Sequence, residues 1–536
     1  MRLSIPSNLT DRKGLFACLS VGFIARLIPE FLAFPNPIGF DTVYYATVMK
    51  SGVIWLHWST FFTSSWLLYA LVVPLYQIVG GDPFLLLKVL GPILFGLNVA
   101  GIFWFARKML SWNWRMGLAA GILFAVQLAS LRISWDLLRN TLGLGLLLFT
   151  VPFIREIESG RGFVSFILLS LLTVFAHEYA AVILLTTVLG LVGWRLIRRR
   201  MDLSSRCLLL AITPALCVFS VGIFLRVFPV HYVVQSNVIG AGDVISASHG
   251  GLFFLTDYLQ VHSSLDYYAT YWNLALSVVV LFAVLFLPYL LLVLKGFFKN
   301  DVLNLWTGLL LIGAFGCLVV PFCALEYWHR WMFMLVYPFT FYAINGLKEL
   351  SLKLQGRKIS FPWFVSKKAT AMVSLTFLLG VTYLATPVLM AYVGATASVV
   401  SVSGIDSSSP SSSLVITDFS RVFLYFSTSP TVPYQDVAGV VQAMGWLDAN
   451  MDAASCVILQ NAFVSWGELY LDKSHEIVSF QTDSNMAVNT ALEHGFSQLY
   501  FVSWNVNIGW YGITVPNGFI RLKDFGRISV YECGSV

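Results

Sequence analysis

Charged side chains are scarce in this chain of 536 residues, where Asp, Glu, Lys and Arg together make up 11%. A water-soluble domain carries about 25% charged residues. Hydrophobic residues make up 58%, which is more than a soluble globule can bury. A bilayer removes this difficulty, because lipid-facing positions need no polar cover. The net charge of +6 sits in short loops between apolar runs, so it indicates membrane topology, and no nucleic-acid partner is expected.

Several motifs of well-known chemistries are also absent. The sequence has no CxxC pair, no Walker motif, no GxSxG, no HExxH and no GxGxxG placed between a strand and a helix. ATP-driven chemistry within this chain is therefore not expected. Two of its cysteines, Cys456 and Cys533, fall in the C-terminal tail. If that tail lies outside the cell, a disulfide and two free thiols are both open alternatives.

Apolar runs of spanning length recur along the chain and predict a polytopic α-helical membrane protein with about eleven spans. They lie near residues 14–34, 85–106, 116–131, 141–154, 162–176, 179–194, 207–228, 269–293, 304–324, 331–347 and 371–392. The first run contains Arg26 and Glu30 and lacks a small-residue cleavage site. We therefore expect an uncleaved first span and not a signal peptide.

Basic residues between the runs predict the orientation in a plasma membrane. Five basic loops are separated by pairs of spans, so all five are expected on the cytoplasmic side. The basic N-terminus belongs there too, provided that Ser65–Val79, which is short and contains Pro74, stays on the outer face as an interfacial or re-entrant segment. Twelve spans with an outer N-terminus is the alternative.

Three regions are expected on this basis. Residues 1–395 form a membrane domain whose first outer loop is 35–84, residues 396–432 form a Ser-rich linker, and residues 433–536 form an extracytoplasmic α/β domain. In the last region a helix is predicted at Val437–Asn450. Strands are predicted at Cys456–Leu459, Ile477–Phe480, Leu499–Val502, Phe519–Leu522 and Ile528–Tyr531.

The first outer loop places Asp41 shortly after the first span, and Tyr44 and Tyr45 follow within one helical turn. A carboxylate that is partly shielded from water has a raised pKa and can take a proton from an attacking hydroxyl. The alternative is that Asp41 caps the helix that begins at Thr42.

Arginines at an expected outer boundary are unusual. Arg132 and Asp136 are four residues apart and could pair on one helix face, and Arg139 follows. The positive-inside rule disfavours arginine at this boundary, so these residues indicate either an anion such as a lipid phosphate or an Arg–Asp clasp.

Two further polar corners interrupt apolar sequence on the same side. One is His177-Glu178, and the other runs from Glu326 to His329 and Arg330. Each could supply a phosphate ligand, a metal ligand or a group that binds sugar hydroxyls. A divalent metal held by Asp41 or Glu178 is an open alternative, although the i, i+4 ligand spacing of metal-binding helices is absent.

The order of features resembles the GT-C superfamily of membrane glycosyltransferases, especially archaeal and bacterial relatives of the dolichyl-phosphate-mannose protein mannosyltransferases. The resemblance lies in residues 1–180. An early Asp41 follows the first span, an aromatic run with a proline comes next, and a Gly81-Asp82-Pro83 turn precedes a helix that ends in Arg107-Lys108. Members often carry two adjacent acids, whereas Thr42 follows Asp41 here, so Glu178 or Asp136 is expected to replace the second.

The resemblance implies transfer of a sugar from a polyprenyl (dolichyl)-phosphate carrier to a protein, glycan or lipid acceptor on the extracytoplasmic face. Asp41 matches the catalytic base of the family. The donor phosphate would be bound by Arg139 and Arg330, with Arg132 and His329 behind them. The expected substrate-binding residues are Tyr44, Tyr45, Asp136, His177, Glu178 and Glu326.

Other functions remain open at this point. An oligosaccharyltransferase that transfers a glycan en bloc belongs to the same superfamily, but the chain lacks the WWD motif of those enzymes. A transporter or flippase of lipid-linked sugars usually shows repeated halves and polar residues near the bilayer midplane, and neither is visible. A non-catalytic scaffold that presents the C-terminal domain is the third alternative.

Overall fold

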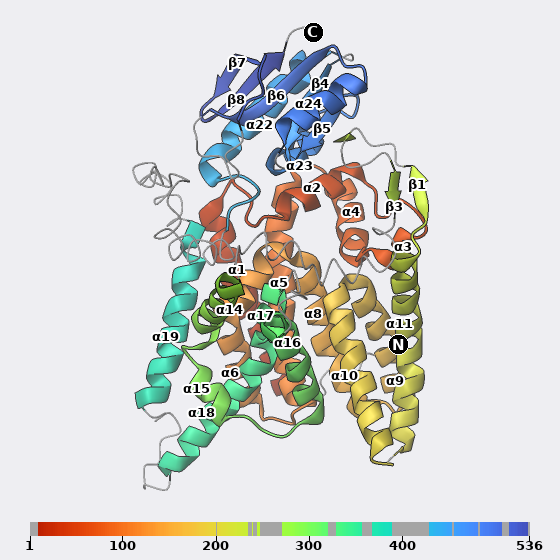
Figure 1. Ribbon diagram of the computed structural model, residues 1–536. Coiled ribbons are helices and arrows are strands. Elements are labelled where there is room, and N and C mark those ends of the chain that lie inside the picture. Colours follow the sequence, from red (N-terminus) through yellow and green to blue (C-terminus); the bar gives the residue numbers. More distant parts are fainter. Residues whose placement is uncertain are drawn as a thin grey trace.

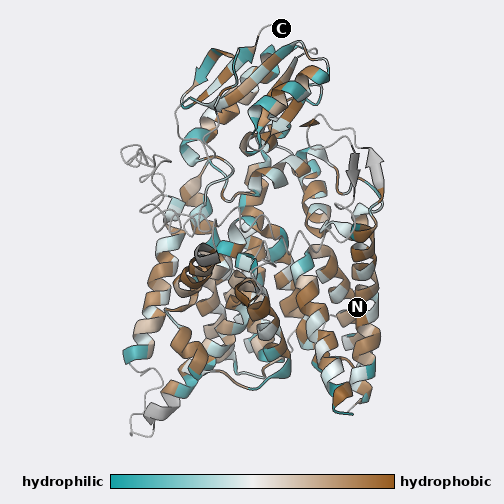
Figure 2. Cartoon of the chain, viewed as in Figure 1, coloured by the Kyte–Doolittle hydropathy of each residue, from teal (hydrophilic) through white to brown (hydrophobic). Residues whose placement is uncertain are grey.

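The computed structural model describes most of the chain. The described residues are 9–199, 201–233, 238–239, 244–246, 271–319, 328–355, 367–387, 428–452, 455–480, 483–505 and 514–533. A body of helices lies below a small sheet domain, and the short helices of the first outer loop lie between them (Figure 1). Hydrophobic residues cover most of the helical body, while the sheet domain is mixed (Figure 2).

Five helices within the described ranges are long and apolar enough to cross a membrane. They are α1 (Leu9–Ala33), α5 (Pro83–Lys108), α10 (Glu178–Ile197), α11 (Leu203–Val227) and α16 (Asp301–Val319). The pair α6 (Trp114–Ala125) and α7 (Leu128–Asp136) is bent by 64° and counts as a sixth span if it is taken as one broken helix. Such helices are typical of a helical membrane protein.

The other expected spans correspond to helices that are shorter or less apolar, so the predicted number of about eleven exceeds these five or six. These helices are α8 (Leu138–Thr150), α9 (Gly160–Ala176), α14 (Tyr271–Phe286), α15 (Leu290–Lys295), α17 (Trp328–Met334), α18 (Val336–Gln355) and α19 (Lys367–Leu384). The break between α7 and α8 falls at Leu137, whose φ of −87° and ψ of 53° are not helical. This break is central to the site described below.

The segment predicted as the first outer loop, residues 35–84, contains three helices, α2 (Thr42–Ser51), α3 (Thr60–Thr63) and α4 (Leu67–Val79). The ambiguous segment Ser65–Val79 corresponds to α4, which has 13 residues and contains Pro74. Its 13 residues fall short of the about 20 that a straight crossing helix needs, as do the 13 residues of α8. Helix α4 lies beside α2 and beneath the sheet domain (Figure 1).

The C-terminal domain is built on a six-stranded mixed sheet with the order β2-β5-β4-β6-β8-β7. Five strands come from the tail, at the places that the sequence predicted: β4 (Ser455–Gln460), β5 (Glu476–Phe480), β6 (Gln498–Trp504), β7 (Ile520–Phe525) and β8 (Ile528–Cys533). The tail also forms helices α22 (Tyr434–Asn450), α23 (Asn461–Tyr470) and α24 (Ser484–Glu493). The edge strand β2 (Val238–Ile239) comes from the segment between α11 and α14 and pairs in parallel with β5.

The two tail cysteines are free thiols. Cys456 on β4 and Cys533 on β8 are both in register with Leu499 on β6, which runs between those strands. Two strand spacings separate them by about 9–10 Å, whereas a disulfide requires Cα atoms within about 7 Å. The disulfide alternative is therefore wrong for this fold.

The sheet domain packs onto the first outer loop through α2. The hydroxyl of Thr47 donates to the carbonyl oxygen of Ser465 at 3.1 Å, and Nζ of Lys50 donates to that of Leu469 at 2.5 Å. One hydrophobic core contains buried residues of α2, α4, α5 and the sheet domain. The tail is therefore packed against the outer-loop helices. The predicted linker at 396–432 lies outside the described residues except for 428–432.

Candidate functional site

Asp41 occupies the N-cap position of α2, but its side chain makes no capping hydrogen bond. Its φ of −77° and ψ of −4° are helical, whereas a capping residue usually has extended backbone angles. The capping interpretation of Asp41 is therefore not supported. Its carboxylate is available for other interactions, and it is only partly exposed.

The turn before Asp41 packs directly against the break between α7 and α8. Gly39 has a φ of 90°, and a Cβ atom at this position would lie 2.6 Å from the carbonyl oxygen of Trp135. The backbone N–H of Phe40 donates to Oδ2 of Asp136 at 3.4 Å. Only glycine permits this backbone angle and this approach without strain. The contact brings two segments that are far apart in sequence into one site.

Charges from three elements surround Asp41. Burial and, to a smaller extent, the carboxylate of Asp136 raise the pKa of Asp41, whereas Arg330, Arg139 and Arg132 lower it, and the balance leaves the pKa at about 6. At neutral pH the group is mainly a carboxylate, yet it is more basic than an ordinary aspartate. A general base works best when its pKa lies near the working pH.

Arg132 and Asp136 form the clasp that was one of the two alternatives at this boundary. Both guanidinium Nη atoms of Arg132 donate to the carboxylate oxygens of Asp136, and the guanidinium also lies 5.9 Å from the ring centre of Phe333. Arg132 is therefore engaged by a carboxylate that stands beside Asp41. Of Glu178 and Asp136, the two acids expected near Asp41, Asp136 is the one whose charge raises the pKa of Asp41.

Arg139 is held differently, because its guanidinium lies over an aromatic ring. Its central carbon is 5.7 Å from the ring centre of Tyr69 on α4. Tyr45 is buried next to Tyr69, with 6.2 Å between the ring centres, whereas Tyr44 is exposed. Stacking on a ring leaves the edge of a guanidinium able to donate to an anion.

A second group of polar residues lies at the corner between α9 and α10. Nδ1 of His177 accepts a hydrogen bond of 3.2 Å from the backbone N–H of Tyr179. Glu178 forms an ion pair of 2.7 Å with Arg226 of α11, which also donates to the carbonyl oxygen of Thr63 in α3. Burial lowers the pKa of His177 to about 3, so its imidazole is neutral at pH 7.

Arg139 and Arg330 connect the two groups. Both lower the pKa of Asp41, and both lower the pKa of His177. At the corner that holds Glu178, a cavity of about 230 Å³ is lined by aromatic and aliphatic side chains and by the Glu178–Arg226 pair. Its lining includes Phe62, Glu178, Tyr179, Phe219, Arg226 and Trp331. The arrangement combines one basic carboxylate with the guanidinium groups of Arg139 and Arg330.

The other predicted residues are placed as follows. His329 lies beside Arg330 on α17. Burial lowers the pKa of His329 well below its ordinary value, and the charges of Arg330 and Arg132 lower it further. Glu326 lies outside the described residues. In the part of the chain that the structure describes, no three His, Cys, Asp or Glu side chains stand together as a metal site would require, and Glu178 is paired with Arg226.

Sequence reasoning missed three residues of this region. Tyr69 is part of the apolar run in α4 and interrupts no pattern, whereas Arg226 is a charge near the end of the apolar run 207–228 and was overlooked. Asn140, next to Arg139, is 1% exposed, and neither polar atom of its amide has a hydrogen-bond partner among the described residues. A buried amide of this kind usually meets water or a ligand. A polar residue at the start of a span, directly after an arginine, was the only available signal.

No family model matches the chain, and no curated protein sequence matches it.

Proposed function

We propose that the chain is a glycosyltransferase that moves a sugar from a polyprenyl-phosphate carrier to a hydroxyl-bearing acceptor on the extracytoplasmic side of a membrane. The observation that carries this proposal is the position of Asp41. Its carboxyl group, whose pKa is raised to about 6, lies among Asp136, Arg139 and Arg330. Such a site can accept a proton and bind a phosphate at the same time.

The reaction follows from these two capacities. Asp41 takes the proton of the acceptor hydroxyl as the acceptor oxygen bonds to the anomeric carbon of the sugar. The bond between that carbon and the phosphate oxygen breaks, and both electrons leave with the lipid phosphate. Arg139 and Arg330 stabilise the negative charge that develops on this leaving group, because guanidinium groups donate to phosphate oxygens in a fixed fork.

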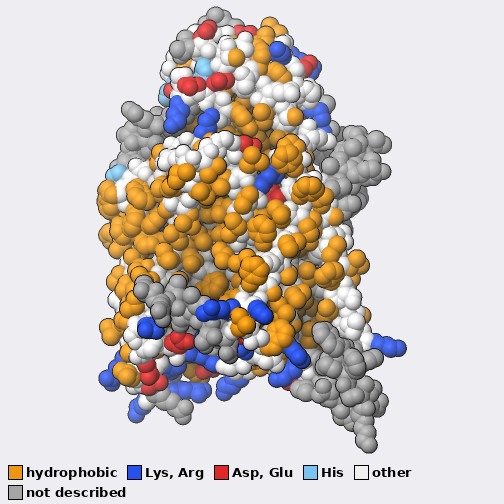
Figure 3. Space-filling view, turned by 180° about the vertical axis from the view of Figure 1, so that it is seen from behind, with side chains coloured by type: hydrophobic (Ala, Val, Ile, Leu, Met, Phe, Trp, Pro, Cys, Tyr) orange, Lys and Arg blue, Asp and Glu red, His pale blue; other side chains and the backbone are white. Residues whose placement is uncertain are grey.

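A lipid-linked donor agrees with the surface of the molecule. On the face drawn in Figure 3, apolar side chains form a broad band over the helical body, and basic side chains gather at the end opposite the sheet domain. The positive-inside rule assigns that basic end to the cytoplasm. The site then opens toward the outer leaflet, and the sheet domain and the first outer loop are extracytoplasmic. We retain about eleven spans and a cytoplasmic N-terminus as part of this proposal.

The direct test uses purified protein in lipid nanodiscs with radiolabelled polyprenyl-phosphate sugars, both dolichyl and undecaprenyl. Wild-type protein should release the free lipid phosphate and a labelled acceptor. Asp41→Asn should lower the rate by about 10²–10⁴-fold, the range over which a general base contributes. Failure of every sugar donor to react, or unchanged transfer by Asp41→Asn, contradicts the proposal.

Asp82→Asn is the matched control. Asp82 is another acid of the first outer loop, and its Oδ1 caps α5 by accepting from the backbone N–H of Phe84 at 2.9 Å. Asparagine preserves such a cap. This variant should therefore retain wild-type transfer, which separates a specific effect at Asp41 from a general effect of removing an outer-loop charge.

A further inference from the structure

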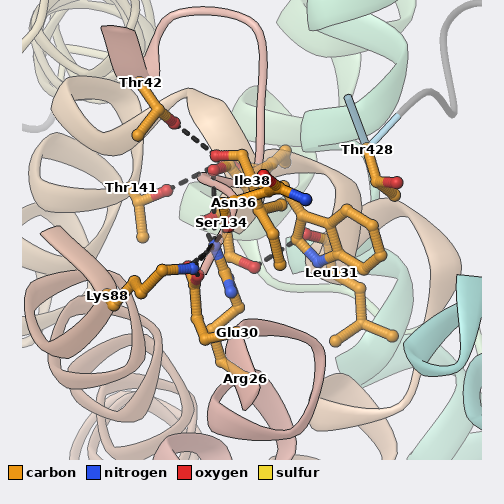
Figure 4. Close-up of polar contacts among 12 residues, drawn as sticks. Arg26, Glu30, Asn36, Ile38, Thr42, Lys88, Leu131, Ser134, Thr141 and Thr428 are labelled. Atoms are coloured by element: carbon orange, nitrogen blue, oxygen red, sulfur yellow. Dashed lines mark hydrogen bonds and ion pairs between the residues drawn. The ribbon is translucent and has the colours of Figure 1, made fainter. Parts of the chain in front are cut away.

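An ion cluster lies directly beneath the turn that leads to Asp41. Arg26 and Glu30 stand one helical turn apart near the end of α1, and Lys88 reaches them from α5. Nη2 of Arg26 lies 2.8 Å from Oε1 of Glu30, and Nζ of Lys88 lies 3.2 Å from Oε2 of Glu30. None of the three side chains is more than 10% exposed. The functional groups of all three point toward one another (Figure 4).

The remaining donors of this cluster hold backbone segments on both sides of the site. Nε of Arg26 donates to the carbonyl oxygen of Ser134 at 3.1 Å, and Nη2 donates to that of Trp135 at 3.3 Å. Nζ of Lys88 donates to the carbonyl oxygen of Asn36 at 2.6 Å. Arg26 thus holds the end of α7, Lys88 holds the loop that leads to Asp41, and Glu30 joins the two cations.

The held segments are the ones that meet above the cluster. The turn at Gly39 packs against Trp135, and Phe40 binds Asp136. The hydroxyl of Thr42 donates to the carbonyl oxygen of Ile38, and on the outer side the backbone N–H of Gly39 donates to that of Thr428 at 2.8 Å. The turn is therefore fixed from below by Lys88 and from above by the C-terminal segment.

Stability alone does not explain three buried charges at this depth. Desolvation of a buried ion pair often cancels its Coulomb attraction, and apolar side chains of similar volume are frequently as stable. What the ionic groups add is direction, because Nε and Nη2 of Arg26 and Nζ of Lys88 donate to carbonyl groups in segments that form the site. Charged groups beside a membrane span are costly and usually have a specific role.

We propose that Arg26, Glu30 and Lys88 are positioning residues, which set the turn that carries Asp41 against the α7–α8 break. They touch no substrate, and their effect passes through the carbonyl groups of Asn36, Ser134 and Trp135. This inference rests on the proposed function for its catalytic consequence, but the geometric consequence can be measured without any reaction.

The test replaces Lys88 with methionine, which keeps the length of the side chain and removes its donors. We expect hydrogen–deuterium exchange at the amides of Gly39 and Phe40 to become at least about tenfold faster, because the loop loses a charge-assisted hydrogen bond. In the transfer assay kcat should fall by about tenfold or more while KM for the donor stays within about threefold, because the arginines keep their places.

A pH profile separates positioning from general loosening. Asp41 is faced by Asp136, Arg330, Arg139 and Arg132, and burial is the main cause of its raised pKa. When the turn loosens, water reaches Asp41 and the pKa of Asp41 falls. The acid limb of the pH profile of kcat should therefore move to lower pH in Lys88→Met. A merely less stable protein would lose activity at all pH values and keep the limb where it is.

Two variants guard against misfolding and one serves as a control. Lys88→Arg should restore both exchange and kcat, because a guanidinium can donate to Glu30 and to Asn36. Glu30→Gln with Lys88→Met removes one charge of each sign and should show the same fast exchange as the single variant. Lys108→Met lies at the other end of α5, where Nζ is 3.7 Å from Glu156, and should match wild type in every measurement.

The outcomes are distinct. If Lys88→Met exchanges the amides of Gly39 and Phe40 as slowly as wild type and keeps the wild-type kcat, the positioning role is overturned. If the wild-type protein transfers no sugar, the proposed function fails, and the exchange measurement alone decides whether the cluster holds the turn. Fast exchange with unchanged kcat and an unmoved acid limb shows that the cluster is structural only, which also overturns the inference.

Discussion

Oδ2 of Asp136 accepts a hydrogen bond of 3.4 Å from the backbone N–H of Phe40, the residue immediately before Asp41. Asp136 is therefore both a brace for the turn and a negative charge next to the candidate base. Since a like charge disfavours ionisation of its neighbour, these two roles can be separated by substitution.

Asp136→Asn should shift the pH dependence of transfer. The negative charge of Asp136 raises the pKa of Asp41, so its removal lowers that pKa from about 6 toward the ordinary value. The substitution also removes the carboxylate that pairs with Arg132, and the charge of Arg132 likewise lowers the pKa of Asp41. The acid limb of the pH–rate profile should therefore move to lower pH. A limb that stays in place or moves upward would mean that Asp41 is not the titrating group.

Arg139→Gln tests phosphate recognition. If the guanidinium of Arg139 binds the donor phosphate, its loss should raise KM for the polyprenyl-phosphate sugar by about 10–100-fold, as expected for a hydrogen bond to a charged group. Binding of the free polyprenyl phosphate, measured by native mass spectrometry, should weaken in parallel. Arg198→Gln is the matched control, since Arg198 also lies over an aromatic ring, 4.3 Å from the ring centre of Trp194, but far along α10. Equal effects of the two changes would contradict a specific role for Arg139.

Asn140→Leu should separate stability from function. The amide of Asn140 is buried without a partner among the described residues, so leucine should leave the melting temperature unchanged or raise it. If the amide serves a bound substrate, transfer should nevertheless fall by about tenfold. A stabilised variant with full activity would show that Asn140 has no part in recognition. Thermal unfolding in detergent and the transfer assay provide the two measurements.

Cys456 and Cys533 should remain separate thiols even in an oxidising medium. Each is in register with Leu499 from opposite sides, so one strand stands between them. Alkylation of the unfolded, unreduced protein followed by mass spectrometry should find both residues modified. A peptide pair linked by a disulfide would show that the strand order of the sheet is incorrect.

Local anomalies in the sequence identified much of the candidate site. Asp41, Arg139 and His177 each interrupt apolar surroundings, and an interruption of that kind is visible without a structure. The proximity of Asp41 to Asp136 is not visible, because it depends on the turn at Gly39 meeting the break after α7. The capping interpretation of Asp41 was chemically reasonable. Only its helical backbone angles and the lack of a capping hydrogen bond from its side chain decide against it.

Other features were not predicted because they depend on pairing between segments that are far apart in the sequence. Arg226 lies within an apolar run, and its partner Glu178 is on another helix. The strand β2 has two residues, which is too short for any alternating pattern. The strands of the tail were predicted well, since β4 and β6 are short apolar segments bounded by polar residues. The hydrophobic pattern of the sequence thus predicts individual helices and strands, whereas the contacts between them are known only from the folded structure.

The parallel pairing of β2 with β5 has a consequence for handling the C-terminal domain by itself. A fragment that begins after the last helix of the membrane body lacks Val238 and Ile239, and β5 then becomes an edge strand with unsatisfied backbone groups. Open edges of this type recruit other strands and promote aggregation. The domain should therefore be produced with a grafted copy of that short segment, or with a charged residue on β5, if a soluble monomer is wanted.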